Sequence, residues 1–106
     1  MLNYEWYTLP DYTYRKYISS VKNNEFTTHE QAERKLNRNL RLAIKTFDGY
    51  LHEDFWYGSL YLRCKNGVII TIENKKKIPE KVASKVKSWK LNGEKYNKLN
   101  EKFGIY

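Results

Sequence analysis

The chain has 106 residues, is 41% hydrophobic and carries a formal net charge of +8. Its length predicts one domain over residues 1–106, and its single cysteine, Cys64, excludes an intramolecular disulfide. The first residues show no leader pattern, and no apolar run approaches the roughly 20 residues that a membrane span needs. We therefore expect a cytoplasmic protein with no membrane segment.

The positive charge is concentrated in the second half of the chain. Residues 1–27 and 28–54 are each neutral, whereas residues 55–106 hold twelve basic and four acidic side chains. Such an asymmetry favours a polyanionic partner. Most of these bases are lysines, and scattered lysine is also ordinary solvated surface, so the charge alone does not decide the partner.

Two segments precede the first clear helix. Residues 1–9 alternate loosely between apolar and polar and predict a strand that ends at Pro10. Asp11 is then placed to cap a helix whose apolar residues recur at helical spacing: Tyr14, Tyr17, Ile18 and Val21. A strand over Tyr12–Ile18 stays open as the alternative, because Tyr and Thr favour strands.

The clearest helix is predicted over residues 28–46. Thr27 with Glu30, or equally Thr28 with Gln31, matches a capping box, and Asp48-Gly49 provides a stop in which Gly49 can take positive φ. One face is apolar: Ala32, Leu36, Leu40, Ala43, Ile44 and Phe47. The opposite face is a basic ridge: Arg34, Arg38, Arg41 and Lys45.

After Gly49 the apolar period changes to two, which predicts strands over Phe55–Lys65 and Val68–Asn74. Between them, Asn66-Gly67 is typical of a two-residue hairpin turn. This turn predicts four cross-strand pairs: Cys64 with Ile69, Arg63 with Ile70, Leu62 with Thr71 and Tyr61 with Ile72. Both faces of the hairpin carry apolar side chains, so we expect packing on both.

The last part of the chain is predicted to be helical. Pro79 suits the first position of a helix whose apolar face is Val82, Val86 and Trp89, and Asn92-Gly93 interrupts it. A final short helix, marked by Tyr96, Leu99 and Phe103, ends at Gly104. The predicted fold is α+β, with three or four helices packed on a small antiparallel sheet that contains the Asn66-Gly67 hairpin.

The sequence makes a weak case for catalysis and predicts neither a metal site nor a cofactor. A lone cysteine cannot provide a zinc site, isolated glycines form no phosphate loop, and Cys64 fits the core better than a nucleophile's position. A small RNase stays open as one alternative, because few side chains suffice for RNA cleavage. The residues available for it are His52, Glu53, Tyr57, Tyr61 and Arg63.

A small, non-enzymatic nucleic-acid-binding protein is the preferred interpretation. Cations bind phosphates and flat rings stack on bases, and the chain interleaves the two. The candidate residues are Tyr57, Tyr61, Arg63, Lys65, Lys75, Lys76, Lys77, Lys85 and Lys90, with Arg34, Arg38 and Arg41 on the helix ridge. The partner would be DNA, RNA or a host protein that already holds nucleic acid, and a homodimer is compatible with the sequence.

The rival interpretation is an inhibitor. The chain resembles, in general character, the short Tyr- and Lys-rich proteins of bacteriophages and mobile elements, many of which block a host enzyme. That resemblance implies an anti-defence, anti-CRISPR-like protein that binds a host nucleoprotein. Ten Tyr and three Trp suit a protein interface as well, because aromatic anchors dominate binding hot spots.

Overall fold

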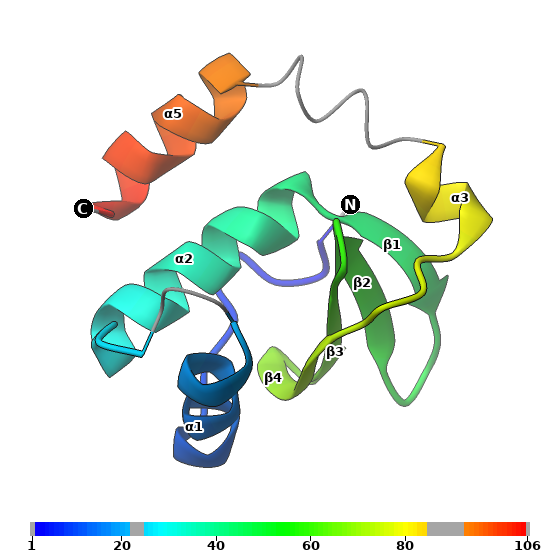
Figure 1. Cartoon of the computed structure of the whole chain (residues 1–106), viewed down its shortest axis with the longest axis horizontal. Coiled ribbons are helices and arrows are strands. Elements are labelled where there is room, and N and C mark those ends of the chain that lie inside the picture. The colour runs from blue at the N-terminus through cyan, green and yellow to red at the C-terminus, as the bar shows by residue number, and fades with distance from the viewer. Residues whose placement is uncertain (1, 22–24, 85–92, 106) are drawn as a thin grey trace.

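A computed structural model describes residues 2–21, 25–84 and 93–105. These residues form four helices and a four-stranded antiparallel sheet, which confirms the predicted α+β fold (Figure 1). The elements in chain order are α1 (Asp11–Ser20), α2 (His29–Leu42), β1 (Ile44–Asp48), β2 (Glu53–Tyr57), β3 (Leu60–Lys65), β4 (Val68–Asn74), α3 (Glu80–Ala83) and α5 (Gly93–Phe103). The strands lie in the order β1-β2-β3-β4.

The prediction of a strand over residues 1–9 is wrong. Thr8 alone pairs with a strand, in an isolated parallel bridge to Val68 at the start of β4. On the other side of this segment the Asn37 side-chain amide accepts a hydrogen bond from Tyr7 N at 2.7 Å and donates one to Tyr7 O at 2.8 Å. The segment is extended but lies between a strand and a helix, so its backbone groups are satisfied without a full strand ladder.

The segment after Pro10 is helical, so the alternative of a strand over Tyr12–Ile18 is wrong. Pro10, and not Asp11, occupies the cap position, and Asp11 lies in the first turn beside Arg15. The helical spacing turns Tyr17 into the core, where its side chain is 2% exposed. The burial of the Tyr17 side chain therefore outweighs the strand preference of Tyr and Thr.

Helix α2 begins as one of the two capping alternatives predicted, with the Thr28 hydroxyl accepting from Gln31 N at 3.2 Å. It ends at Leu42, earlier than expected, because the chain from Ile44 onward forms β1. Gly49 therefore lies in the β1–β2 turn and ends no helix, and its φ is not positive. A Cβ at Gly49 would come within 2.3 Å of the Phe47 ring, so any other residue here would require that exposed ring to shift.

The predicted strand Phe55–Lys65 is two strands, β2 and β3, separated by a turn in which Gly58 has a φ of 61°. The Asn66-Gly67 turn is confirmed, because both residues have positive φ, 52° and 76°. Cys64 pairs with Ile69 as predicted, but a register shift between Arg63 and Cys64 changes the pairs beyond it. The observed pairs are Arg63 with Thr71, Leu62 with Ile72 and Tyr61 with Glu73.

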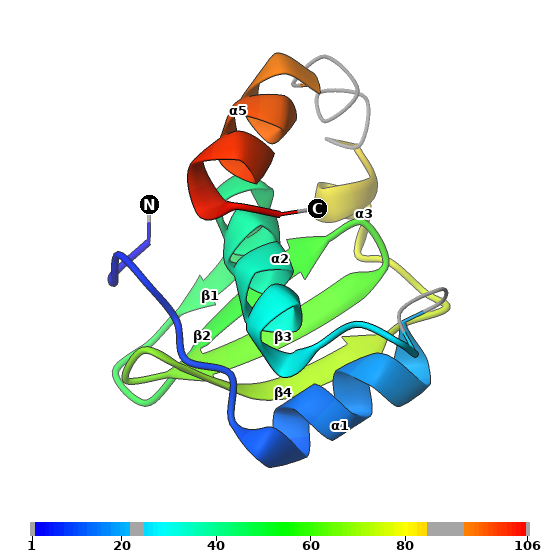
Figure 2. The same cartoon turned by 90° about the vertical axis from the view of Figure 1, so that its left-hand side faces the viewer.

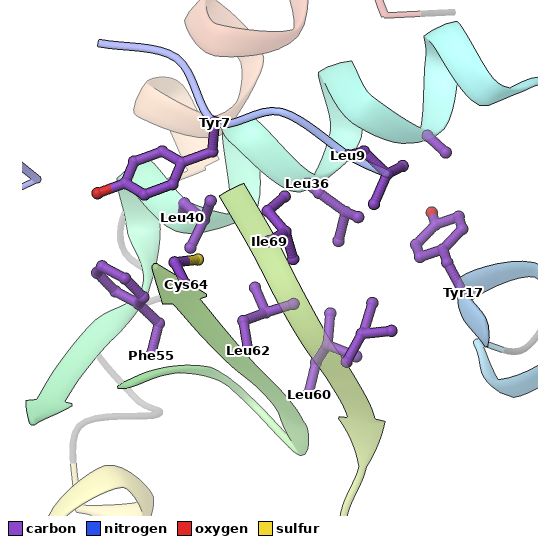
Figure 3. Close-up of a cluster of buried hydrophobic side chains, with 12 residues drawn as sticks. Tyr7, Leu9, Tyr17, Leu36, Leu40, Phe55, Leu60, Leu62, Cys64 and Ile69 are labelled. Carbon is purple, nitrogen blue, oxygen red and sulfur yellow. The ribbon is translucent and has the colours of Figure 1, made fainter. Parts of the chain in front are cut away.

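The hydrophobic core lies between the sheet and α2 (Figure 3). Helix α2 contributes Leu36 and Leu40, and the sheet contributes residues that alternate along the strands, such as Leu62 and Ile69, all of them at most 1% exposed. Helix α1 lies along β4, and α5 lies on the far side of α2 (Figure 2). The helices α1 and α2 thus pack against the sheet, and α5 packs on α2, on the side away from the sheet.

Helix α3 lies on the side of the sheet opposite α2 (Figure 1). Pro79 takes the cap position and not the first helical position predicted for it, and the helix buries Val82 completely. Val86 and Trp89 lie outside the described residues. Helix α5 ends as predicted, with Gly104 at a φ of 66°. None of the helices in the described ranges is long and apolar enough to cross a membrane.

Candidate nucleic-acid interface

The side of the sheet away from α2, which we call the outer face, gathers aromatic and charged side chains. In β3 the side chains of Leu60, Leu62 and Cys64 are buried, so the alternation of the strand turns the intervening residues to the other side. The outer face consists of Ile44 from β1, Asp54 and Trp56 from β2, Tyr61, Arg63 and Lys65 from β3, and Thr71 and Glu73 from β4, with Lys75 just beyond and α3 on the same side of the sheet.

Tyr61 lies at the centre of this face. Its ring centroid is 5.2 Å from that of Trp56, its cross-strand neighbour. The Arg63 guanidinium and the Lys75 ammonium lie 6.0 and 5.6 Å from the same ring centroid. Burial, followed by a hydrogen bond with Asp54, raises the pKa of the Tyr61 phenol.

Two carboxylates share the outer face with these cations. Arg63 Nε donates to Asp54 Oδ1 at 2.9 Å, a cross-strand ion pair, and Lys75 pairs with Glu73. The hydrogen bond from Lys75 lowers the pKa of Glu73. The centre of the face is therefore a neutral mixture of rings and ion pairs.

Three of the predicted lysines remain free for a ligand. Lys65, Lys76 and Lys77 are exposed, and within the described ranges none of them forms an ion pair. Lys65 stands at the Asn66-Gly67 end of β3, whereas Lys76 and Lys77 follow β4 at the opposite end of the hairpin. Lys85 and Lys90, which were predicted to extend this surface, lie outside the described residues.

Tyr57 does not belong to the outer face. It packs against the hydrophobic core and faces Arg38 and Tyr96 on the helical side of the sheet. Burial raises the pKa of its phenol. The turn at Gly58 causes this separation, because Tyr57 and Tyr61 belong to different strands and not to one continuous alternation.

The predicted basic ridge of α2 holds the chain ends in place. Arg34 Nη1 donates to Gly104 O at 3.1 Å, and Arg41 Nη2 donates to Glu5 O at 2.6 Å. Arg38 is 9% exposed and donates to Asn100 Oδ1 at 2.9 Å, with its guanidinium 4.4 Å from the Tyr96 ring centroid. These three arginines pack against α5 and the N-terminal segment.

The fourth member of that ridge, Lys45, lies in β1 and points to the core side of the sheet. Its ammonium is 3.0 Å from the Glu53 carboxylate, which is 4% exposed and also accepts from the Tyr7 hydroxyl at 3.2 Å. This buried network pairs every charge it contains, as buried charges require.

The residues proposed for an RNase are divided between the two sides of the sheet. Glu53 and Tyr57 face the core, whereas Tyr61 and Arg63 lie on the outer face. His52 is stacked on Phe47, with its Nε2 3.7 Å from Asp54 Oδ1. Cys64 is fully buried, and burial raises the pKa of its thiol, which confirms it as a core residue.

Sequence reasoning missed Trp56, Asp54 and Glu73 on the outer face. It treated Phe55–Lys65 as one strand, so it did not pair β2 with β3. The signal was Gly58-Ser59 in the middle of that segment, because glycine inside an apparent strand often marks a turn or a bulge. Placing a turn there would have set Trp56 opposite Tyr61.

Residues 8–102 match the protein family described as YorE. The chain belongs to the YorE family. Among the described elements, the match covers α1, α2, α3 and the four strands completely, and α5 up to Lys102. The family name suggests a prophage-like protein, in agreement with the phage-type character of the sequence. Neither the comparison with curated proteins nor that with solved structures finds a match.

Proposed function

We propose that this YorE-family chain is a small, non-enzymatic, phage-type protein that binds nucleic acid through the outer face of its sheet. The observation that carries the proposal is the half-buried Tyr61 ring on the outer face, with the exposed lysines Lys65, Lys76 and Lys77 at the two ends of the hairpin. Ring and cation together supply the two interactions that a nucleic-acid strand offers, stacking and phosphate neutralisation. The net charge of +8 supports the same proposal.

The proposal is tested by measuring the affinity of the full chain for labelled oligonucleotides over a range of salt concentrations. Phosphate contacts release counterions, so the logarithm of the affinity falls linearly with the logarithm of the salt concentration, by about 0.7 per contact for a single strand. We expect a steep slope corresponding to several contacts. Weak binding that does not change with salt would contradict the proposal.

Incubating the chain with labelled RNA tests whether it is an enzyme. A binding protein leaves RNA intact after prolonged incubation, and among the described residues of the outer face both carboxylates are paired with cations. If the RNA is cleaved, and His52→Ala abolishes the cleavage, the RNase alternative replaces the binding proposal.

A second candidate function, inhibition of a host protein, is supported by the β1–β2 turn. Tyr50 is fully exposed, at 101%, Leu51 is 65% exposed and Phe47 is 48% exposed. Exposed apolar residues that gather at one tip are typical of protein interaction sites. The tip carries no cation of its own, so it suits a protein partner better than a phosphate backbone.

This candidate is tested by a pull-down from host lysate after nuclease treatment. We expect a partner to bind the wild-type chain but not the double variant Tyr50→Ala, Leu51→Ala. Tyr12→Ala is the matched control, because it removes an aromatic ring that is 60% exposed on α1. A partner that both variants retain, or no partner at all, argues against inhibition through this tip.

A further inference from the structure

We propose that the outer face binds single-stranded RNA, with the bases on Tyr61 and the phosphates on the lysines at the two ends of the hairpin. This inference rests on the proposed function and specifies its ligand. It follows from the arrangement of charges on the outer face, where ion-paired groups lie at the centre and free cations lie at the edge.

The centre of the face is unsuited to phosphates. Asp54 and Glu73 lie beside the two cations nearest the Tyr61 ring and neutralise them, with Asp54 Oδ1 2.9 Å from Arg63 Nε. A phosphate placed there would meet two carboxylates. A base meets no such repulsion, and its amino groups can donate to these carboxylates.

The Tyr61 ring provides the surface on which a base can stack. It projects from the outer face of a sheet and is only partly buried, whereas its neighbour Trp56 is 8% exposed and supports it from one side. Aromatic rings on an antiparallel sheet are a recurrent platform for unpaired bases.

The free lysines lie where the phosphates of such a strand would pass. Lys65 is at one end of β3, and Lys76 and Lys77 follow Lys75, whose backbone N donates to Ser59 O at the other end. A strand laid along β3 therefore meets a cation, the Tyr61 ring and a cation in succession. A duplex cannot use this arrangement, because its bases are paired inside and its exterior is phosphate.

RNA is favoured over DNA by the two carboxylates. A ribose 2′-hydroxyl donates a hydrogen bond, and Asp54 and Glu73 are acceptors on the same face as the stacking ring. DNA has no donor at this position. The same carboxylates that exclude phosphate thus provide a reason to prefer ribose.

The test is fluorescence anisotropy with a labelled RNA of about 12 nucleotides, within the range of single-strand site sizes. The same RNA annealed to its complement and a DNA of the same sequence are the comparison ligands. The variants are Tyr61→Ala, Tyr61→Phe and, as a matched control, Tyr50→Ala, which removes a fully exposed ring outside the outer face. Thermal melts check folding, and Tyr61→Leu replaces Tyr61→Ala if the latter does not fold.

We expect single-stranded RNA to bind at least about tenfold more tightly than the duplex, and Tyr61→Ala to lose about tenfold on the single strand alone. Tyr61→Phe, which keeps the ring, should lose less affinity than Tyr61→Ala, and Tyr50→Ala should leave the affinity unchanged. The inference is overturned if the duplex or the DNA binds as tightly as the single-stranded RNA. It is also overturned if Tyr61→Ala weakens the binding of every ligand equally. If salt-sensitive binding persists in those cases, the proposed function stands, and if no ligand binds, both fall.

Discussion

The arginines of α2 and the lysines of the β3–β4 hairpin look equivalent in the sequence and differ completely in the fold. Arg38 is 9% exposed and held by Asn39, Asn100 and the Tyr96 ring. Lys76 and Lys77 are exposed and have no ion pair within the described part of the chain. One group of cations holds a helix, and the other is available to a ligand.

The difference follows from the chemistry of the two side chains. A guanidinium offers several donors in a planar fork and stacks on rings, so it can link a helix to carbonyl oxygens and aromatic residues of another segment. An ammonium is a compact, strongly hydrated charge that gains little from burial. A basic stripe rich in arginine on a helix can therefore be a packing surface.

The largest expected effect comes from truncating a buried arginine. Arg38→Ala removes the stack on Tyr96 and leaves the oxygens of Asn39 and Asn100 without their donor. We expect it to lower the free energy of unfolding by about 2–4 kcal/mol, measured by urea denaturation. Lys76→Ala is the control and should change stability by less than about 0.5 kcal/mol. If the two variants lowered the free energy of unfolding equally, Arg38 would be no more structural than Lys76.

The buried side chain of Tyr17 should make the stability of the fold depend on pH in the alkaline range. Burial raises the pKa of Tyr17 to about 12, so the native state retains a proton that the unfolded state loses near pH 10. The contribution of Tyr17 to the free energy of unfolding should be fully present below pH 10. As the pH rises toward 12, the free energy of unfolding should fall by about 1–2 kcal/mol. The Tyr17→Phe variant should show a shallower fall in melting temperature over this window. An identical pH profile for both proteins would contradict the assignment.

The three lysines that follow β4 should affect nucleic-acid binding and leave the free energy of unfolding unchanged. The triple variant Lys75→Ala, Lys76→Ala, Lys77→Ala should weaken nucleic-acid binding by roughly tenfold at low salt and reduce the salt slope by about 1.4, because Lys75 is paired with Glu73 and only the other two lysines contact phosphates. The matched control is Lys95→Ala, Lys98→Ala, Lys102→Ala, which removes the same charge from exposed positions of α5. If both variants lose the same affinity, net charge and not the outer face determines binding.

The smallest expected effect is at the β1–β2 tip. Because Tyr50 is fully exposed, Tyr50→Ala should change the free energy of unfolding by less than about 0.5 kcal/mol. The measurement is urea denaturation beside the wild-type chain. A larger loss would mean that the ring is packed in solution, and the tip would then no longer be an exposed anchor.

Local patterns predicted much of the fold. The Thr28 cap, the helical spacing around Tyr17 and the Asn66-Gly67 turn each depend on residues close together in the chain, and the structure contains all three. The strand boundary at Gly58 and the end of α2 at Leu42 were missed. The end of α2 depends on pairing between strands, which a local periodicity does not contain, whereas the boundary at Gly58 had a local signal in Gly58-Ser59.

The candidate site could be predicted only in part. The alternation of β3 is local, so the shared face of Tyr61, Arg63 and Lys65 followed from the sequence. Their carboxylate partners did not follow, because Asp54 and Glu73 are brought there by neighbouring strands and by the register shift at Arg63. The assignment of these residues to nucleic-acid binding stays a prediction.

The sequence by itself determined the α+β class, the main helix, the hairpin and the location of the net charge in the second half of the chain. Only the tertiary structure decided which cations are free. Arg38 donates to the side chain of Asn100, 62 positions away, and Arg41 donates to the backbone carbonyl of Glu5, 36 positions away. Burial and pairing depend on such distant contacts, so a charge that is equal in the sequence becomes structural in one place and available in another.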